Sequence, residues 1–358
     1  MIHVPLITPF GPDGRVDTRA LEALARQVLA DGASGLVALG TTGEPAALED
    51  DERAEVAATV GRVCRERGAR FVVGAGAGST RRAARELAAL AGARVIPDAA
   101  LVTVPSFTRP GEAGVLAHFR ELAAAGPVPL LVYHVPHRTG QPLTARALRQ
   151  LAAIPGVIGV KYATGGIDAE TVGFLGDHPA GFAVLAGDDA LAPALLALGA
   201  DGAVLASAHL ATARWAELAA TGDRHLGHRL AGLGAALFRE PNPAVVKAVL
   251  HAHGRIPTPD VRLPLLPASP EALRAALAAE AAVGIGPAAG TGPVAGEGPG
   301  PAAGRAGTGL GTGLGTGTRA VTVAEAVAGA GRGVRSRPAG AAAPQPWAAP
   351  AAAPRLVP

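Results

Sequence analysis

The stretch VIGVKYATG, residues 157–165, is a short apolar run rich in β-branched side chains, and it carries Lys161 near its end. Such a run predicts a buried strand. A lysine at this place needs a reason, because burial disfavours a charged ammonium group, and a neutral amine can attack a ketone to form a Schiff base. The alternative is a lysine whose stem packs at the strand end while its head reaches solvent.

Lysine is rare in this chain. Lys161 and Lys247 are the only lysines among 32 basic residues, and all the others are arginine. Arginine stays charged and cannot form an imine, so a lysine kept inside an apolar strand favours amine chemistry. Lys247 is the weaker candidate because it lies in a predicted helix, where packing or a salt bridge is enough to explain it.

Short apolar runs alternate with helix-like segments through residues 1–210. The predicted strands are residues 4–7, 35–39, 71–74, 100–104, 130–133, 157–161, 182–186 and 203–206. The predicted helices between them are residues 18–31, 49–67, 80–91, 111–125, 144–154, 169–176 and 190–199. Strict alternation indicates parallel βαβ units, and eight strands predict an α/β fold, a TIM (β/α)8 barrel. In that fold the chemistry lies at the carboxyl ends of the strands.

The rest of the chain differs in composition. Residues 211–280 contain further helix-like segments, at 211–220, 223–238, 243–253 and 270–280, and predict a C-terminal helical appendage. Residues 281–358 are rich in Gly, Ala and Pro and include the near-repeat GTGLGTGLGTGT at 307–318. With so few large apolar side chains this segment cannot form a core, so we expect a disordered tail.

The charge distribution limits the possible partners. The sequence pI of about 9.6 suggests a nucleic-acid partner, but six arginines and only two acidic residues lie in 281–358, so residues 1–280 are close to neutral. No basic stripe with interleaved aromatic residues is present. Cys64 is the only cysteine, which excludes a disulfide framework or a thiolate metal cluster. We expect a cytoplasmic protein that acts on small molecules, with no cofactor, metal, nucleic acid or membrane partner.

Glycine, hydroxyl and phenol groups follow several predicted strands. The second strand is followed by GTTGE at 40–44, whose glycines permit a tight turn and whose hydroxyls and backbone N–H groups could hold a carboxylate. An ordinary turn with threonine capping is the alternative. Tyr133 and Tyr162, the only tyrosines, end the fifth and sixth strands, so both are predicted to lie near the chemistry.

Five motifs resemble one known family in order and spacing. They are GTTGE at 40–44, YHVPHRTG at 133–140, KYATG at 161–165, GDD at 187–189 and EPNPAVVK at 240–247. They are similar to the dihydrodipicolinate synthase / N-acetylneuraminate lyase family over about residues 1–275. The resemblance implies a class I, metal-free lyase of lysine and diaminopimelate biosynthesis that joins pyruvate to aspartate 4-semialdehyde. It also implies a homo-oligomer, either a dimer or a tetramer.

The resemblance further implies roles for individual residues. Lys161 would condense with pyruvate, and the imine would become an enamine that attacks the aldehyde. Tyr133 would donate and accept the proton at the imine, and Thr41 would pass that proton along. A phenol needs such help near neutral pH, and a hydrogen-bonded hydroxyl supplies it. The implied substrate-binding groups are Thr42, Gly43, Arg138 and the backbone of Val204.

Three positions depart from the family's pattern. The synthases usually have at 107 a tyrosine that completes a proton relay in the neighbouring subunit, whereas Phe107 has no hydroxyl. His134 replaces an asparagine, either as a substitute acid or base or as a hydrogen-bonding equivalent of the amide. Tyr162 stands where the synthases usually have glutamate. These departures favour an alternative function, an aldolase or dehydratase acting on a 2-keto-3-deoxy sugar acid.

Two further expectations concern binding. A hypothesis from a different class is a catalytically idle paralogue that binds a small acid, although the retention of Lys161 and Tyr133 argues against it.

The resemblance also locates a lysine-binding site at residues 45, 50, 53, 78, 82 and 106, where this chain lacks the family's usual polar and aromatic side chains. We therefore expect no feedback inhibition by lysine.

Overall fold

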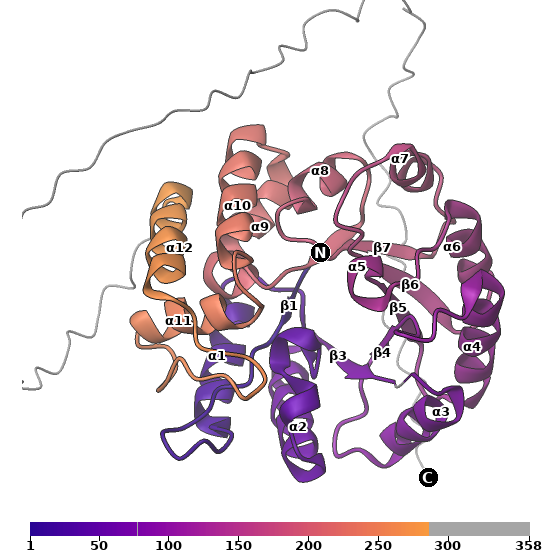
Figure 1. The fold of residues 1–358 in the computed structure, drawn as a ribbon, viewed down its shortest axis with the longest axis horizontal. Coiled ribbons are helices and arrows are strands. Elements are labelled where there is room, and N and C mark those ends of the chain that lie inside the picture. The colour runs from indigo at the N-terminus through magenta and orange to yellow at the C-terminus, as the bar shows by residue number, and fades with distance from the viewer. Residues whose placement is uncertain (77, 286–358) are drawn as a thin grey trace, which may run out of the picture. The chain divides into compact units, whose positions relative to one another are not determined.

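The computed structural model describes residues 1–76 and 78–285. They form a closed barrel of eight parallel strands, in which each strand pairs with the next along the chain and the last pairs with the first (Figure 1). The strands are β1 (Ile2–Pro5), β2 (Gly35–Ala38), β3 (Arg70–Ala75), β4 (Ala99–Thr103), β5 (Leu130–His134), β6 (Val157–Tyr162), β7 (Ala183–Ala186) and β8 (Gly202–Val204). The predicted TIM barrel is confirmed.

A ring of helices surrounds the barrel (Figure 1). The helices that follow the strands are α1 (Thr18–Ala30), α2 (Asp50–Arg67), α3 (Thr80–Ala89), α4 (Gly111–Ala125), α6 (Ala145–Ala152), α7 (Ala169–Gly176), α8 (Ala192–Ala197) and α9 (Ala208–Thr221). A one-turn helix, α5 (Pro136–Thr139), lies between β5 and α6. Within the two described ranges no helix is both long and apolar enough to cross a membrane.

Local sequence explains where some of these helices begin and end. Asp17 caps α1 by accepting a hydrogen bond from the Ala20 N–H at 2.9 Å. At α2, Glu49 and Glu52 form a reciprocal capping box, and Gly68 ends the helix with a left-handed φ of +63°. The buried residues of α1 recur every three or four positions, as an amphipathic helix on a barrel requires.

Side chains of successive strand residues alternate between the inside of the barrel and the helix layer. The inside is filled by an apolar cluster that includes Val37, Val72, Leu101, Leu131 and Leu185. Val160 and Tyr162 of β6 belong to a separate, larger cluster between the barrel and the helices. Lys161, between them in the strand, therefore faces the inside, and Tyr133 of β5 belongs to the inner cluster.

The first and last strands differ by up to two residues from the predicted ranges. β1 begins at Ile2 rather than at residue 4, because His3 pairs with Gly35 of β2 and with Val204 of β8. β8 ends at Val204, so the predicted residues 205 and 206 belong to the turn before α9. Pairing with neighbours on both sides sets these limits, rather than the length of the apolar run.

Up to residue 285, three helices follow α9, namely α10 (Arg224–Leu237), α11 (Ala244–Ala252) and α12 (Pro270–Val283). α10 packs against α8, α9 and α12, and α11 packs against α12, so they form a layer outside one side of the barrel (Figure 1). α9 begins at Ala208 and packs on β1, which makes it the eighth helix of the barrel. Of the tail expected at 281–358, residues 286–358 lie outside the described residues, and α12 continues to Val283.

Candidate active site

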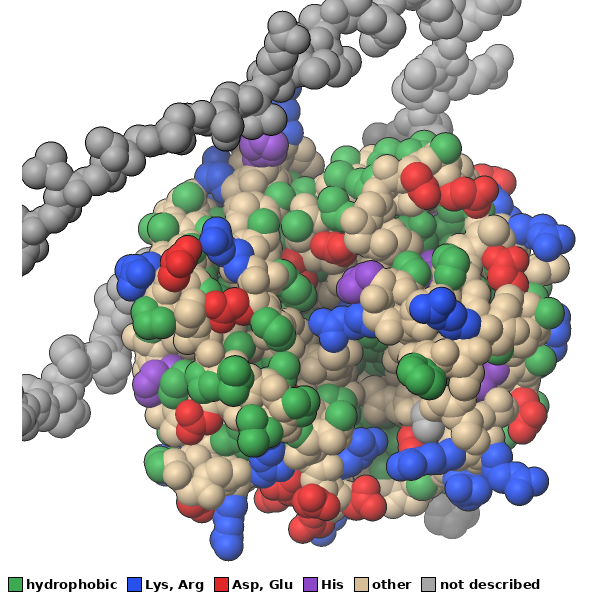
Figure 2. All heavy atoms as spheres, viewed as in Figure 1, with side chains coloured by type: hydrophobic (Ala, Val, Ile, Leu, Met, Phe, Trp, Pro, Cys, Tyr) green, Lys and Arg blue, Asp and Glu red, His purple; other side chains and the backbone are tan. Residues whose placement is uncertain are grey.

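A cavity of about 190 Å³ lies at the carboxyl ends of the strands, where a TIM barrel places its chemistry. In the view of Figure 2 the molecule is hollowed near its centre, and charged and histidine side chains surround the hollow. Predicted site residues that line the cavity are Thr41, Thr42, Tyr133, Arg138, Lys161 and Val204. Gly43 and Phe107 are not among its lining residues. The volume suits a ligand smaller than a drug-sized molecule, which needs about 300 Å³ or more.

Lys161 reaches the cavity from β6. Its side chain is buried, and its partners in the sheet are Tyr133 of β5 and Leu185 of β7. The Lys161 Nζ lies 4.4 Å from the centre of the Tyr133 ring. Among residues 1–76 and 78–285, no hydrogen-bond or ion-pair partner holds this Nζ. An amine without a fixed partner, next to a phenol, is free to react with an electrophile.

The turn at residues 40–44 brings two hydroxyl groups to the cavity. After β2 the chain makes one turn of 3-10 helix, Thr41–Gly43, which the Thr8 hydroxyl supports by donating to the Gly43 carbonyl at 2.7 Å. Thr41 is exposed, whereas Thr42 is buried and its Oγ1 accepts a hydrogen bond from Asn242 Nδ2 at 2.9 Å. The two threonines thus line the cavity, and Gly43 contacts Thr8 behind them.

Two adjacent carboxylates, Asp188 and Asp189, follow β7 and line the cavity. Asp189 is buried, and its oxygens accept hydrogen bonds from the backbone N–H groups of Ala206 at 3.3 Å and Ser207 at 2.6 Å. Burial raises the pKa of Asp189, and the hydrogen bonds to Ser207 and the charge of Lys161 oppose that shift. Asp189 therefore ties the end of β7 to the turn after β8, and the two carboxylates do not act as a pair.

The short helix α5 supplies part of the rim of the cavity. His137 and Arg138 lie on it, are exposed, and line the cavity together with Phe238. A guanidinium group can bind a carboxylate through two parallel hydrogen bonds, so Arg138 is placed to receive the acid group of a second substrate. His137 and Phe238 were not predicted from the sequence, and only their positions beside Arg138 and the EPNP motif could have indicated them.

Phe107 lies on the loop between β4 and α4. Its side chain is 96% exposed, and its backbone has a left-handed φ of +67°, which residues other than glycine rarely adopt. Its N–H donates to the Thr139 carbonyl of α5 at 3.2 Å, so the loop is attached to the rim of the cavity. The exposed ring is available to a second molecule rather than to the cavity of its own chain.

His134 and Tyr162 face the helix layer, contrary to the expectation that both lie near the chemistry. The Tyr162 hydroxyl is 3.0 Å from Thr171 Oγ1, and its ring stacks on Phe174 of α7. The His134 ring lies 5.7 Å from the Tyr162 ring, and burial lowers the pKa of His134 to about 4. The hypothesis that His134 is a substitute acid or base is therefore wrong, because alternation along β5 and β6 turns both side chains away from the cavity.

Lys247 is buried, but it lies outside the cavity. Its Nζ is 2.6 Å from Glu44 Oε1, donates to the Asp260 carbonyl at 2.8 Å, and lies 4.0 Å from the centre of the Phe10 ring. The interpretation that a salt bridge accounts for this lysine is confirmed. Lys161 is the lysine that lines the cavity.

Asn242 also lines the cavity, although it was not predicted from the sequence. It lies between α10 and α11, is buried, and donates the hydrogen bond to Thr42. A compositional signal was present, because Asn242 is the only asparagine in the chain. Asn242 thus shares with Lys161 the property of belonging to a residue type that is rare in this chain.

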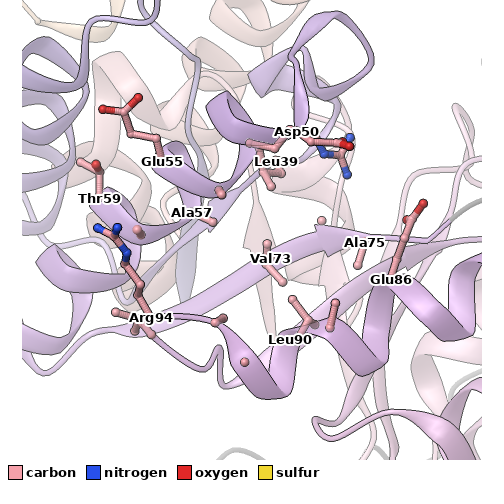
Figure 3. Close-up of a pocket in the computed structure, with 18 of the residues that line it drawn as sticks. Leu39, Asp50, Glu55, Ala57, Thr59, Val73, Ala75, Glu86, Leu90 and Arg94 are labelled. Atoms are coloured by element: carbon pink, nitrogen blue, oxygen red, sulfur yellow. The ribbon is translucent and has the colours of Figure 1, made fainter.

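A larger cavity, of about 1250 Å³, lies between α2, β3 and α3 (Figure 3). Its floor is apolar, with Leu39, Val73 and Leu90, and charged side chains such as Glu86 and Arg94 stand at its edges (Figure 3). Its described lining residues include no lysine, histidine or tyrosine. The smaller cavity at the strand ends is therefore the candidate active site.

Comparisons with known proteins agree with this geometry. The sequence profile of the dihydrodipicolinate synthetase family matches residues 1–281. The 4-hydroxy-tetrahydrodipicolinate synthase of Leptothrix cholodnii is 38% identical over 278 residues, which cover 74% of this chain and 92% of that protein. The enzyme of the same name from Pseudomonas aeruginosa is 37% identical over 290 residues, which cover 76% of this chain and 96% of that protein.

Solved structures give the same result. The chloride-inhibited dihydrodipicolinate synthase from Acinetobacter baumannii, complexed with pyruvate, matches with a TM-score of 0.73 and 34% identity, over 79% of this chain and 98% of that chain. The dihydrodipicolinate synthase from Thermotoga maritima matches with a TM-score of 0.73 and 28% identity, over 79% of this chain and 98% of that chain. The chain belongs to the dihydrodipicolinate synthetase family.

Proposed function

We propose that this chain is a 4-hydroxy-tetrahydrodipicolinate synthase, which condenses pyruvate with aspartate 4-semialdehyde through a Schiff base on Lys161. The observation that carries the proposal is the position of the Lys161 Nζ in a small cavity, 4.4 Å from the centre of the Tyr133 ring. The names of the curated relatives and the pyruvate complex of the Acinetobacter baumannii enzyme support it.

The first step joins pyruvate to the enzyme. The Lys161 amine attacks the keto carbon of pyruvate, and the resulting carbinolamine loses water to give an imine. Tyr133 donates the proton with which the carbinolamine oxygen leaves as water. The Thr42 hydroxyl and the backbone N–H groups of the turn at 40–44 hold the pyruvate carboxylate, beside the backbone of Val204.

The second step forms the carbon–carbon bond. Tyr133, deprotonated by the first step, removes a proton from the methyl group of the bound pyruvate to give an enamine. The enamine attacks the aldehyde carbon, the C=O π bond breaks, and Tyr133 returns the proton to the aldehyde oxygen, while Arg138 binds the carboxylate of the aldehyde substrate. The amino group of that substrate then attacks the imine carbon, closes the ring and releases Lys161 as a free amine. Overall one carbon–carbon bond and one carbon–nitrogen bond form, and one water molecule leaves.

Proton exchange with solvent is assigned to Thr41. Its side chain lines the cavity and is also exposed, so its hydroxyl can connect Tyr133 with water outside. Phe107 has no hydroxyl with which to take over this exchange. The sugar-acid alternative shares the Lys161 imine, but Phe107 is the only departure that still favours it, since His134 and Tyr162 face the helix layer.

We also propose that the chain works as a homo-oligomer, a dimer or a tetramer. Phe107 supports this assignment, because a fully exposed phenylalanine with a left-handed backbone is costly in an isolated chain. One similar solved structure is described as a monomeric dihydrodipicolinate synthase variant, so the assembly has to be measured directly. Sedimentation of the wild type and of Phe107→Ala should show weaker association in the variant.

Borohydride trapping tests the imine. The protein is treated with pyruvate and borohydride, and intact mass and peptide mapping should locate one pyruvate adduct on Lys161. In Lys161→Ala the remaining lysine, Lys247, is buried in its ion pair with Glu44 and should take no adduct, which provides an internal control. A folded wild type without an adduct would overturn the proposal. Activity assays separate the two functions. The synthase consumes aspartate 4-semialdehyde, whereas the alternative enzyme releases pyruvate from a sugar acid.

A further inference from the structure

We propose that Asn242 is a positioning residue, which holds the Thr42 hydroxyl so that its proton points into the cavity toward the carboxylate of pyruvate. This inference rests on the proposed function, because it assigns Thr42 to the pyruvate carboxylate. Asn242 is the only asparagine among 358 residues, and it lines the cavity. A chain that uses asparagine nowhere else has kept it at this one position.

The direction of this hydrogen bond decides what the Thr42 hydroxyl can do. The Asn242 Nδ2 donates to Thr42 Oγ1 at 2.9 Å. A hydroxyl group has one proton and two lone pairs. Because the amide N–H occupies a lone pair, the hydroxyl proton remains for an acceptor, and no other hydrogen bond within the described residues uses it. A bound carboxylate in the cavity is the matching acceptor.

A second contact fixes the same two segments. Lys247, five residues after Asn242, forms the buried ion pair with Glu44, which is two residues after Thr42. The hydrogen bond and the ion pair together fix the distance between the turn at 40–44 and the start of α11. The backbone that carries Asn242 is therefore held next to Thr42 before any substrate binds.

The other end of the amide is unpaired. Asn242 Oδ1 is buried and has no hydrogen-bond partner in the described part of the chain. An unpaired buried carbonyl lowers stability, so stability alone does not account for an amide at this position. Reversing the amide would make Thr42 donate to Oδ1 instead, and the hydroxyl would then have no proton for the substrate.

The test compares Asn242→Ala, Asn242→Asp and Thr42→Val with the wild type, by steady-state kinetics at saturating aldehyde. Asn242→Ala leaves the Thr42 hydroxyl its proton but lets that hydroxyl turn away from the cavity. The pyruvate KM should therefore rise, by at most about tenfold, the effect of losing one hydrogen bond to a charged group, and kcat should change less. Asn242→Asp has nearly the same shape but can only accept, so it should raise KM further. In the Thr42→Val background, Asn242→Ala should add little, because its effect acts through the missing hydroxyl.

Tyr162→Phe is the matched control, since it removes a different buried hydrogen bond outside the cavity. It should lower the melting temperature without changing the pyruvate KM. The proposal is overturned if Asn242→Asp, or Asn242→Ala where Asn242→Asp does not fold, binds pyruvate as well as the wild type. It is also overturned if the two single effects multiply in the double variant. A wild type that forms no borohydride adduct overturns the proposed function instead, so the two failures are distinguishable.

Discussion

Gly187, directly after β7, leaves the space that the Lys161 side chain occupies. A Cβ at this position would lie 2.7 Å from Lys161 Cγ and 2.8 Å from Cε, closer than ordinary contact allows. Gly187→Ala should displace the amine without straining the backbone, because the φ of Gly187 is not positive. We expect kcat to fall at least about 100-fold, since a shift of about 1 Å in a reacting group costs that much.

Gly166→Ala is the matched control for this substitution, because no atom lies within 4 Å of a Cβ added there. Its kcat and its yield of the borohydride adduct should equal those of the wild type. Steady-state kinetics of both variants measures the difference. Equal activity in Gly187→Ala and Gly166→Ala would show that Lys161 tolerates displacement.

His134 makes stability depend on pH. Burial lowers its folded-state pKa to about 4, and in the unfolded chain the pKa returns to about 6.5. Between these values the unfolded chain binds a proton that the folded protein does not, so the free energy of unfolding falls as the pH drops through this range. Once the pH has fallen through this range, the titration of His134 has lowered the free energy of unfolding by roughly 3 kcal/mol.

His134→Asn removes this titration and should flatten the dependence. Urea unfolding over a series from about pH 7 to about pH 4 measures the free energy of unfolding of both proteins. Part of the dependence should remain, because burial also lowers the pKa of His3 and of His209 to about 4. Identical slopes for the variant and the wild type would contradict the expectation.

The rarity of a residue type made part of the site predictable. Lys161 and Tyr133 belong to types that occur twice each, and both line the cavity. Rarity could not distinguish Tyr133 from Tyr162. The register of the sheet decides whether a strand residue points into the barrel or toward the helices, and a single residue at the end of a strand does not reveal that register. Asn242 was missed because its partner Thr42 lies 200 positions away, and no local pattern connects the two.

At the scale of elements, the loop between β4 and α4 holds Phe107 and Arg109 with left-handed φ values of +67° and +45°. In the proposed oligomer, the ring of Phe107 is available to a neighbouring cavity. Phe107→Tyr restores the hydroxyl that the relay lacks, so kcat should rise, by up to about 100-fold for a well-positioned acid or base. Phe107→Leu, which has no hydroxyl, should give no gain. An unchanged kcat in Phe107→Tyr would show that Thr41 exchanges its proton with water alone.

The ion pair between Glu44 and Lys247 joins the turn at 40–44 to α11. The exposed fractions of the two side chains are 1% and 0%. Burial lowers the pKa of Lys247 to about 8 although Glu44 is 2.6 Å away. The cost of burying this charge therefore exceeds the attraction between the partners, and removal of one partner would leave the other charge uncompensated.

Lys247→Met should lower the free energy of unfolding by about 3–5 kcal/mol, whereas Lys247→Met combined with Glu44→Gln should recover most of that loss. Urea unfolding of the single and double variants measures both. Arg82→Met is the control, because its ion pair with Glu86 is largely exposed on the Arg82 side and should contribute at most about 1 kcal/mol. Equal losses in the single and double variants would contradict this account.

At the scale of the whole molecule, the barrel was predictable because eight apolar runs alternate with helical segments and parallel strands need such crossovers. The helices after the barrel were also predictable from local patterns. Their part in the cavity was not, because a helical pattern reports which face is apolar and not which distant segment it contacts. The candidate site therefore needs both the barrel and residues 234, 238 and 242 beyond it.

Truncation tests how much of the chain this site requires. A chain ending after residue 285 keeps every residue that lines the cavity and all of α12, which Gly284 ends in the left-handed conformation. It should match the full chain in melting temperature, kcat and pyruvate KM. A chain ending after residue 268 loses the buried residues of α12, among them Ala272 and Ala276, and should melt at a lower temperature because α10 and α11 lose an apolar partner. Reduced activity of the 1–285 chain would contradict this expectation and assign a function to residues 286–358.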